Sequence, residues 1–282
     1  MGNVKVFVPT KGVIERIRTT RWLLDSGADY YFVCHTDEDR KRLYEKFGIP
    51  LNRIIPCNPP FVDIRTIGWI RDWIVDNLTN KSDWYCMIDD NTTILKPPDP
   101  WYQLDRIDFR DYPTADFREL YRVEIWPSEV IALIESIIQK CIDQGTVFGG
   151  MAIEENYYFR STKWTKLGFI RGKFCVSQNN GIPWQINPEV VIQTDIARSV
   201  DCVARYGSVV INRFCHPESV EFSTGGVGTL EYRQPFMVQS LLWLRQNYRG
   251  LIVKAPDKDW QVKFLIRGKK DIQEWREENG WI

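Results

Sequence analysis

The sequence predicts a single α/β domain in which helices flank a central mixed sheet. Short apolar runs rich in β-branched and aromatic residues alternate with amphipathic segments through roughly the first hundred residues. That alternation is typical of sheets whose strands are joined by helical crossovers. The 282 residues suffice for one large domain or two small ones, and no internal repeat or low-complexity linker divides them. We therefore expect one domain over residues 1–282.

The first part of the chain is expected to supply strands and helices in turn. Strands are predicted at 4–8, 29–34, 53–56 and 84–88, each a short run of apolar, β-branched or aromatic residues. Helices are predicted between them, from Val13 to a stop at Gly27, over 37–47 and over 64–78. In the last of these, isoleucines recur at helical spacing and define one apolar face.

The second part is less regular. Residues 96–127 are rich in proline, aspartate and aromatic residues and are expected to form irregular surface structure. Helices are predicted over 127–145, 189–206 and 235–248, with Asp195 and Asp201 near the start of the second. Strands are predicted at 146–148, 169–176 and 208–211, and a glycine-rich, mobile loop at 223–229.

The composition limits the classes of partner. Thirty-seven basic and thirty-seven acidic residues cancel, so the whole chain carries no general field for nucleic acid or membrane, and such a partner would need a local patch. The seven cysteines show no zinc-ligand spacing, which favours a reducing cytoplasm. Neither an export leader nor an apolar run of about twenty residues is present, so we expect a cytoplasmic protein that does not span a membrane.

The predicted strand 84–88 ends directly in Asp89, Asp90 and Asn91. In open α/β sheets, ligands bind outside the carboxyl ends of strands, and oxygen donors suit Mg²⁺ or Mn²⁺. A divalent cation site is one interpretation. In the other, these residues only end the strand and cap the following turn. No dinucleotide glycine fingerprint and no phosphate-cradling glycine–lysine loop is present, which disfavours the familiar NAD and ATP folds.

Two further residues have both a chemical and a structural interpretation. His216, between a strand and the glycine-rich loop, is a third metal ligand or a structural histidine. Asp195 is a general base for an attacking hydroxyl or a first-turn aspartate that complements the helix dipole. His35, at the end of a strand without a companion, is expected to be structural.

Several of these features occur together in one known family. The loop Pro9-Thr10-Lys11 after the first strand, the helix containing residues 68–73 (Gly-Trp-Ile-Arg-Asp-Trp) and the strand ending in Asp89-Asp90-Asn91 resemble glycosyltransferases of the GT-A fold, whose metal motif is Asp-x-Asp. The resemblance extends over residues 4–230. It is strongest to the phage and TET-associated branch, which adds sugars to hydroxymethylated pyrimidines in DNA. Asn91 departs from the aspartate of many relatives and removes one charge from the metal site.

The resemblance implies a GT-A-type, Rossmann-like mixed sheet and a division of labour along the chain. Residues 1–95 would form the nucleotide-sugar-binding half, 96–230 the acceptor-binding half and 231–282 a basic extension of helix and strand. The residues implied for a UDP-sugar are Pro9, Thr10, Lys11, Arg65, Arg71, Asp89 and Asp90. Those implied for Mn²⁺ or Mg²⁺ are Asp89, Asn91 and His216, with Asp90 as an alternative to Asn91. Asp195 would deprotonate the acceptor if the enzyme inverts the anomeric centre, and would have another role if it retains it.

A DNA acceptor is expected to need basic and aromatic residues, because a base must leave the duplex to enter a pocket. Residues 245–270 contain eight basic and two acidic residues, although an ordinary solvated face is as good an explanation. Trp164, Trp184 and the basic group Lys163, Lys166, Arg171 and Lys173 would supply stacking and phosphate contacts, with core packing as the alternative for the tryptophans. The residues predicted to bind the acceptor are Gly149, Gly150, Trp184 and Arg171.

The leading hypothesis is a metal-dependent transfer of a sugar from a UDP-sugar to the hydroxymethyl group of 5-hydroxymethylcytosine in phage DNA, in the host cytoplasm. The same chemistry on a polysaccharide or protein acceptor is the second hypothesis. A non-catalytic nucleotide-binding or DNA-binding module is the third, and it predicts that Asp89→Ala leaves binding intact. Nucleotidyltransferases rank last, because the glycine-rich basic loop that they use after the first strand is not evident.

Overall fold

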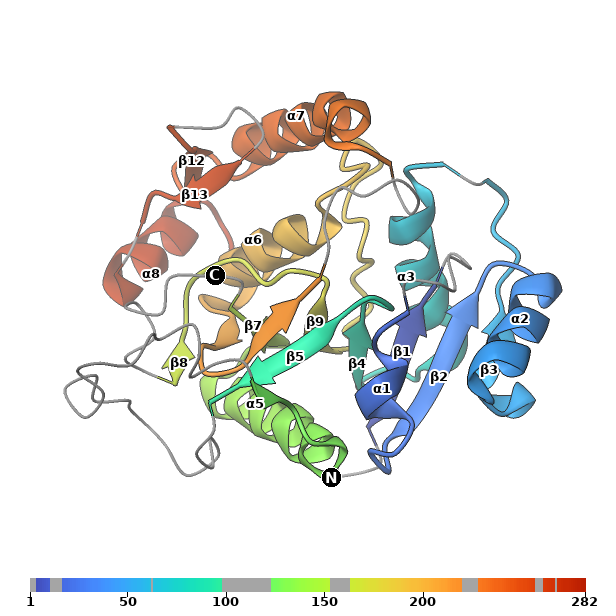
Figure 1. Ribbon diagram of the computed structural model, residues 1–282. Coiled ribbons are helices and arrows are strands. Elements are labelled where there is room, and N and C mark those ends of the chain that lie inside the picture. The colour runs from blue at the N-terminus through green and yellow to red at the C-terminus, as the bar shows by residue number, and fades with distance from the viewer. Residues whose placement is uncertain are drawn as a thin grey trace, which may run out of the picture.

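The computed structural model describes residues 4–10, 17–61, 63–97, 123–152, 163–219, 228–256, 261–266 and 268–282. Its centre is an eight-stranded sheet in the order β3-β2-β1-β4-β9-β7-β10-β8 (Figure 1). The strands are β1 Lys5–Pro9, β2 Asp29–Cys34, β3 Ile54–Pro56, β4 Trp84–Ile88, β7 Phe148–Met151, β8 Trp164–Thr165, β9 Phe174–Gln178 and β10 Val210–Asn212. The prediction of a mixed α/β fold is therefore confirmed.

The sheet is mixed because two strands run against their neighbours. β1 pairs in parallel with β2 and β4, and β2 with β3. β9 is antiparallel to both β4 and β7, and β8 is antiparallel to β10. Successive strands of the chain are added on one side of β1 as β2 and β3, and the next strand, β4, is added on its other side. The carboxyl ends of β1 and β4 therefore lie side by side at a switch point of the strand order, where α/β sheets usually bind ligands in a crevice.

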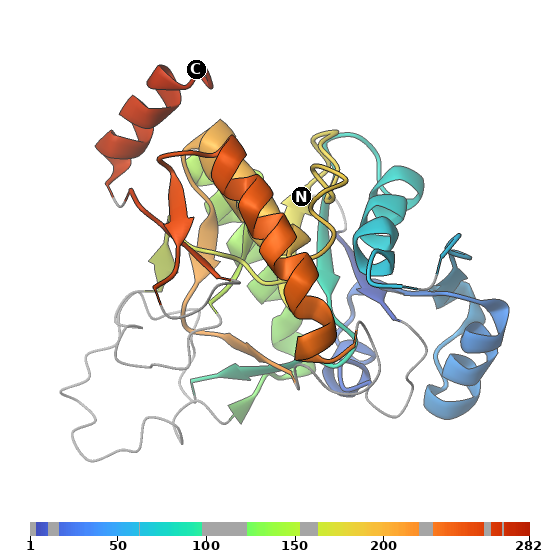
Figure 2. The ribbon, with the colours of Figure 1, turned by 90° about the horizontal axis from the view of Figure 1, so that it is seen from above.

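Helices cover both faces of the sheet. They are α1 Thr20–Leu23, α2 Asp37–Phe47, α3 Thr66–Leu78, α5 Val130–Gln144, α6 Thr194–Tyr206, α7 Leu230–Asn247 and α8 Lys269–Glu278, with the short 3₁₀ helices η2 Leu51–Arg53 and η4 Pro127–Glu129. Alternate strand residues point to opposite faces, so the sheet contributes to two apolar clusters. Residues of α1, α2 and α5 complete one cluster, and residues of α3, α6, α7 and α8 complete the other (Figures 1 and 2).

Two small sheets lie beside the central one. β5 Thr93–Lys96 pairs with β6 Val123–Glu124 and with β11 His216–Glu218, and β12 Ile252–Lys254 pairs with β13 Val262–Phe264. β5 and β6 lie within or beside the stretch predicted to be irregular, whose residues 98–122 fall outside the described structure. β5 is a polar-rich strand whose partner β11 lies more than a hundred positions away, which explains why its sequence alone did not reveal it.

Most predicted elements are confirmed, and several boundaries are corrected. Within the described residues, the helix predicted from Val13 to Gly27 is only the short α1, and residues 11–16 fall outside them. The strand predicted at 146–148 is β7, and it begins at Phe148. The ranges 29–34, 37–47 and 84–88 are observed as predicted. α6 begins at Thr194, not near 189, because Gln193 adopts a left-handed backbone with φ of 60°. Asp201 therefore lies in the middle of α6. α7 begins at Leu230, where the Thr229 side chain accepts a hydrogen bond from the Tyr232 amide, so Pro235 lies inside the helix. The strand predicted at 169–176 is β9, and it begins at Phe174.

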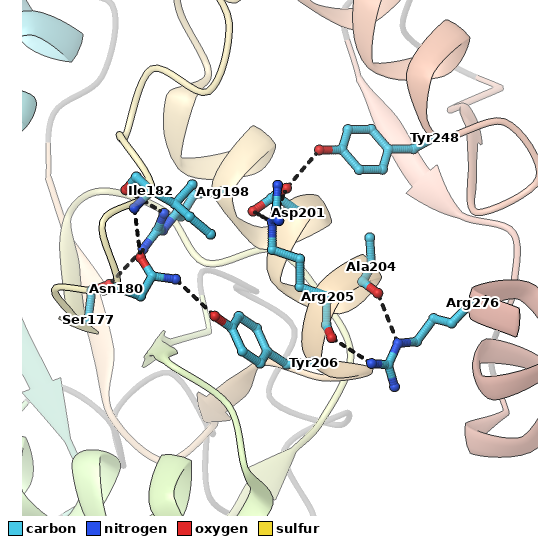
Figure 3. A network of polar contacts seen from close by, with 10 residues as sticks. All are labelled: Ser177, Asn180, Ile182, Arg198, Asp201, Ala204, Arg205, Tyr206, Tyr248 and Arg276. Carbon is cyan, nitrogen blue, oxygen red and sulfur yellow. Dashed lines mark hydrogen bonds and ion pairs between the residues drawn. The ribbon is translucent and has the colours of Figure 1, made fainter. Parts of the chain in front are cut away.

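The C-terminal region packs on the side of the sheet covered by α6. Ile272 and Trp275 of α8 and Leu241 and Leu244 of α7 are buried in the same cluster as the α6 core residues. Polar contacts add to this packing at the C-terminal half of α6 (Figure 3). The Arg276 guanidinium donates to the carbonyl oxygens of Ala204 and Arg205, which lie in the last turn of that helix.

Buried Asp201 is the centre of the second part of this network. Its carboxylate accepts hydrogen bonds from Arg205 at 2.8 and 2.9 Å and from the Tyr248 hydroxyl at 3.0 Å. Burial, followed by the Asp201 charge, raises the pKa of Tyr248. The Trp281 ring stacks on Tyr248. The Arg205 guanidinium lies 5.1 Å from the centroid of the Trp281 ring. The described residues of α7, α8 and the segment between them thus pack on α6 through both apolar and polar contacts.

All seven cysteines are buried and unpaired by disulfides. Burial raises the pKa of the Cys34 thiol to about 12 and that of Cys57 to about 11, as for small apolar core residues. Among the described residues, none of the helices combines the length and the apolar character needed to cross a membrane.

Candidate functional site

The candidate site is built around the turn that follows β4. The Thr92 amide donates to the Asp89 carbonyl at 3.2 Å and closes the turn. From α1 and the residue before it, the Thr19 hydroxyl donates to the Asp89 carbonyl at 2.7 Å and the Trp22 indole to the Thr92 carbonyl at 3.1 Å. The amides of Arg18 and Thr19 donate to the Asp90 carbonyl. The backbone of this turn is therefore held in place by α1.

The turn is also attached to the segment that leads into β9. The Asp89 amide and the Thr92 hydroxyl both donate to the Lys173 carbonyl, at 3.2 and 3.1 Å. Because these contacts satisfy backbone groups of the turn, the Asp89 carboxylate is not needed to cap it. Its side chain keeps 34% of its surface exposed. A fixed backbone with a partly exposed carboxylate is the arrangement expected of a preorganised ligand.

Asp90 faces the end of β1. Its carboxylate is hydrogen-bonded by the Thr10 side chain and by the Asn91 amide. Burial raises the pKa of Asp90 to about 6, against the lowering effect of the Thr10 hydrogen bond. The contact joins the carboxyl ends of β1 and β4. The interpretation in which these residues cap the turn therefore applies to the Asp90 side chain. It does not apply to the Asp89 side chain, which contacts Arg71.

Arg71 of α3 connects the turn to α6. Its guanidinium donates from Nη2 to Asp89 Oδ1 at 3.4 Å and from Nη1 to the Thr194 hydroxyl at 3.2 Å. Burial lowers the pKa of Arg71, but the charges of Asp89 and Asp195 outweigh it, so that the pKa is raised overall. The pKa of Asp89 is also raised. Burial is the main cause, the Asp195 charge adds to it, and the Arg71 charge opposes it. The three charged side chains therefore form one electrostatic unit.

Asp195 lies in the first turn of α6, as predicted. Its Oδ2 accepts a hydrogen bond from the Gly172 amide at 2.8 Å, and its Oδ1 from the Ile196 amide at 2.9 Å. Each carboxylate oxygen still has a further lone pair with which to accept a proton. The side chain is half-buried. The geometry brings Asp89, Arg71 and Asp195 together from three elements, and both interpretations of Asp195 are compatible with it.

His216 lies apart from this group along the chain. The β5–β11 register places it opposite Leu95, four residues after Asn91, whereas Glu218 lies opposite Thr93. Two residues of a strand span roughly 7 Å, so the histidine is that much farther along β5 than Glu218. The His216 ring nitrogen Nδ1 lies 3.4 Å from the Ala152 carbonyl oxygen, after β7. The structure thus supports the structural interpretation of His216, and the register brings Glu218 closer to the turn.

The residues predicted to contact the acceptor are mostly interior. A Cβ at Gly149 would lie 2.6 Å from Ile137 of α5, and one at Gly150 would lie 2.4 Å from Ile170. Both glycines are buried in β7 and permit close packing. Trp184 is fully buried, and its indole donates to the Tyr85 hydroxyl at 2.9 Å. The burial of all three residues favours packing over contact with an acceptor. Arg171 is half-buried, one residue from Gly172.

The remaining predicted donor residues differ in position. Pro9 is the buried last residue of β1, next to Thr10. Arg65 precedes α3, is exposed, and forms a paired contact with Asp63 while its guanidinium lies 4.5 Å from the Phe61 ring centroid. Lys11 lies outside the described residues. Of the donor set, Asp90 contacts Thr10 and Asp89 contacts Arg71, so these four residues lie around the turn that follows β4.

Thr19, Trp22 and Gly172 are parts of the site that sequence reasoning missed. Thr19 and Trp22 are some seventy positions from the turn that they hold, and no local pattern announces such a contact. Gly172 did interrupt a predicted strand, and that signal was informative. A Cβ at this position would lie 1.9 Å from Arg71 Nη2, so glycine alone leaves room for the guanidinium.

The turn after β4 carries oxygen-bearing side chains of the kind that hard divalent cations prefer. Asp89, Asp90 and Asn91 offer carboxylate and amide oxygens on one fixed turn, and Mg²⁺ is commonly held by one or two carboxylates together with substrate phosphates. Within the described ranges, no three or more His, Cys, Asp or Glu side chains are placed so that they could hold a metal ion together.

Comparisons with known proteins leave this geometry as the basis for assigning a function. No model of a known protein family matches the chain, and no curated protein matches its sequence.

Proposed function

We propose that the protein is a GT-A-type glycosyltransferase that uses a UDP-sugar donor and Mn²⁺ or Mg²⁺. The observation that carries the proposal is the contact of Asp90, next to Asp89 after β4, with Thr10 after β1. β1 and β4 are adjacent parallel strands at the point where the strand order changes direction, and the carboxyl ends of such strands are the usual position for a nucleotide in an open α/β sheet. Oxygen donors at that position suit a cation bound to a diphosphate.

The residues around the turn after β4 would divide the work. Asp89, with Asn91 and Asp90, would hold the cation, which when bound supplies positive charge to offset that of the departing UDP. Thr10 would face the nucleotide from the end of β1. Asp195 would accept the proton of the attacking hydroxyl if the anomeric centre is inverted. Arg71 keeps Asp89 and Asp195 in one charged unit, since it contacts or approaches both.

As the acceptor we propose 5-hydroxymethylcytosine in DNA. This part of the proposal is supported by the resemblance of the motif order and by exposed basic side chains in the C-terminal region. Those that the structure describes as exposed are Arg245, Arg249, Lys254, Lys263, Lys269 and Lys270. Basic side chains on one region supply the phosphate contacts that any DNA-binding surface requires.

The test is transfer in solution. The purified protein is incubated with Mn²⁺, a panel of UDP-sugars and duplex DNA containing 5-hydroxymethylcytosine, and released UDP and the mass of the DNA are measured. We expect UDP release together with a mass gain equal to one sugar residue per modified base. Asp89→Asn should lower the rate by about 100-fold or more, since it removes a charge on the proposed cation site. Asp76→Asn, an exposed carboxylate of α3, is the matched control and should retain the wild-type rate.

Each other outcome selects an alternative. UDP release without a gain in DNA mass would reject DNA and favour a polysaccharide or protein acceptor. UDP binding without release from any donor, unaffected by Asp89→Ala, would reject transfer and favour a non-catalytic nucleotide-binding module.

A further inference from the structure

Arg71 is a charged side chain in the interior of the candidate site. We infer that Arg71 is a positioning residue: it fixes Asp89 and the first turn of α6 relative to each other, and it does not touch the nucleotide-sugar. This replaces the expectation that Arg71 approaches the uridine or diphosphate. The inference concerns the same site and rests on the proposed function only where turnover is measured.

The surroundings of Arg71 leave the donor no access to it. Arg71 is 5% exposed. Its guanidinium carbon lies 5.1 Å from the centroid of the Trp184 ring, a cation–π contact on one side. The backbone of Gly172 lies so close that a Cβ there would be 1.9 Å from Nη2. The guanidinium is therefore enclosed between a tryptophan ring and a glycine.

The tryptophan that covers Arg71 is itself fixed. Its indole donates to the buried Tyr85 hydroxyl of β4, and its amide donates to the Asp72 carboxylate, next to Arg71 on α3. The Gln185 amide donates to the same carboxylate at 3.3 Å. Trp184, which covers the Arg71 guanidinium, is thus hydrogen-bonded to both α3 and β4.

Arg71 uses its planar fork to join two elements. Nη2 reaches Asp89 at the end of β4, and Nη1 reaches Thr194 at the start of α6. Nε is buried and makes no hydrogen bond within the described structure. A guanidinium can hold two acceptors at fixed angles, whereas a lysine ammonium is a point charge that cannot reproduce the fork. The geometry therefore requires arginine rather than any cation.

The charge of Arg71 also affects the two carboxylates beside it. Asp89 and Asp195 each influence the pKa of Arg71, and Asp195 raises that of Asp89, so the two carboxylates repel each other across the guanidinium. Without Arg71, the two like charges would repel each other in a partly buried site, and their side chains would move apart. Because Asp195 is held by the Gly172 amide, movement of this carboxylate would free that amide. Loss of Arg71 is therefore expected to change placement at the site, not the affinity for the donor.

The experiment compares three variants. Arg71→Met removes the charge, Arg71→Lys keeps the charge without the fork, and Gly172→Ala keeps Arg71 but displaces it. Arg42→Met, a substitution of an exposed arginine on α2, is the control. The first readout is independent of activity: exchange of the amide hydrogen of residue 172, corrected for the intrinsic rate of glycine or alanine. We expect this exchange to be accelerated at least about tenfold in Arg71→Met and Gly172→Ala and to be unchanged in the control.

The second readout is steady-state kinetics with the UDP-sugar identified in the transfer assay. In Arg71→Met and Gly172→Ala we expect kcat to fall about 100-fold while the donor KM changes less than about threefold, as for groups misplaced by roughly 1 Å. Arg71→Lys should recover part of the kcat. A raised donor KM with unchanged kcat would overturn the inference, since Arg71 would then bind the donor.

Two further outcomes are decisive. If the protein transfers no sugar, the proposed function fails, and Gly172 exchange alone decides the positioning role. If Arg71→Met is too unstable for exchange, unfolding of the double variant Arg71→Met/Asp89→Asn is measured. We expect the second substitution to offset part of the instability, because it removes the carboxylate left unpaired. Strictly additive effects would overturn the inference.

Discussion

Adjacent carboxylates of one turn have different surroundings. Asp89 is paired with Arg71 and keeps about a third of its side chain exposed. Asp90 is bonded to Thr10 and the turn, and burial raises its pKa to about 6. Environments that separate the pKa values of neighbouring acids often mark different roles. Asp89 is therefore the stronger candidate for a cation ligand, and Asp90 for a group that links β4 to β1.

The raised pKa of Asp90 predicts how stability depends on pH. Because folding raises this pKa from its usual 3.8 to about 6, the folded protein binds the proton more tightly than the unfolded chain. In EDTA, the free energy of unfolding should therefore be highest below about pH 4 for this group and fall as the pH rises to about 6 or above. The full shift in pKa corresponds to a change of up to about 3 kcal/mol in the free energy of unfolding. Solvent that reaches the partly buried Asp90 carboxyl reduces this change.

Urea unfolding between about pH 4 and pH 7 measures this dependence. Asp90→Asn should flatten the pH profile, because the amide oxygen still accepts from Thr10 but does not titrate. Asp76→Asn, exposed on α3, should leave the profile unchanged. Identical slopes in the wild type and Asp90→Asn would contradict the environment described for Asp90.

At the residue scale, the sequence predicted where the site residues lie on strands and helices better than it predicted which side chains they contact. Asp89 and Asp90 were placed correctly because a buried apolar run ends visibly before them. The pairing of Arg71 with Thr194 spans 123 positions, and nothing in the local pattern of either helix specifies it. His216 was proposed as a metal ligand on the same incomplete basis, since its place depends on the register of β11 with β5. Side-chain chemistry can be predicted locally, but convergence depends on the packing of whole elements.

At the scale of elements, glycine positions show where local patterns mislead. Gly149 and Gly150 were assigned to acceptor binding, yet they lie in β7, beneath α5 and against Ile170. A glycine pair suggests a loop until its neighbours are known. The start of α7 was misplaced for a related reason: Pro235 fits a first turn, but Thr229 provides the actual cap. Tertiary contacts decided the role of the glycines in β7, whereas a local cap decided the start of α7.

Gly149→Ala tests the packing role of β7. The new Cβ would lie 2.6 Å from Ile137 Cγ2 and 2.7 Å from Cys141 Sγ, so α5 must shift away from the sheet. We expect a loss of about 1–3 kcal/mol in the free energy of unfolding, measured with urea. Turnover per folded molecule should not change, since the glycine is buried.

A double-mutant cycle provides the control. Ile137→Ala alone should cost about 2–5 kcal/mol because it leaves a cavity. In the Gly149→Ala background it should cost clearly less, since the added methyl group occupies part of the vacated space. Additive losses, or a selective loss of turnover in Gly149→Ala, would favour a functional role for this glycine over packing.

At the scale of the whole molecule, the described contacts join the C-terminal region to α6. α8 buries Ile272 and Trp275 in the cluster that also contains α3 and α6 residues, and Arg276 caps the last turn of α6. The opposite end of the same helix carries Thr194 and Asp195. The sequence predicted one domain from the lack of a linker, and these contacts supply a physical reason to expect one cooperative unit.

Trp275→Ala tests this cooperativity. Trp275 is 6% exposed, donates to the Arg249 carbonyl at 2.9 Å and lies against Gly250, so its removal should cost about 3–5 kcal/mol. If the C-terminal region and the sheet unfold together, calorimetry of the wild type should give a single transition whose calorimetric and van't Hoff enthalpies agree, and the variant should show the same single transition at a lower temperature. Trp126→Ala is the control, since that side chain is 62% exposed and its loss should change stability by less than about 0.5 kcal/mol. Two separate transitions, with only the weaker one lowered by Trp275→Ala, would show that residues 231–282 unfold independently of α6 and hence do not fix the helix that carries Asp195.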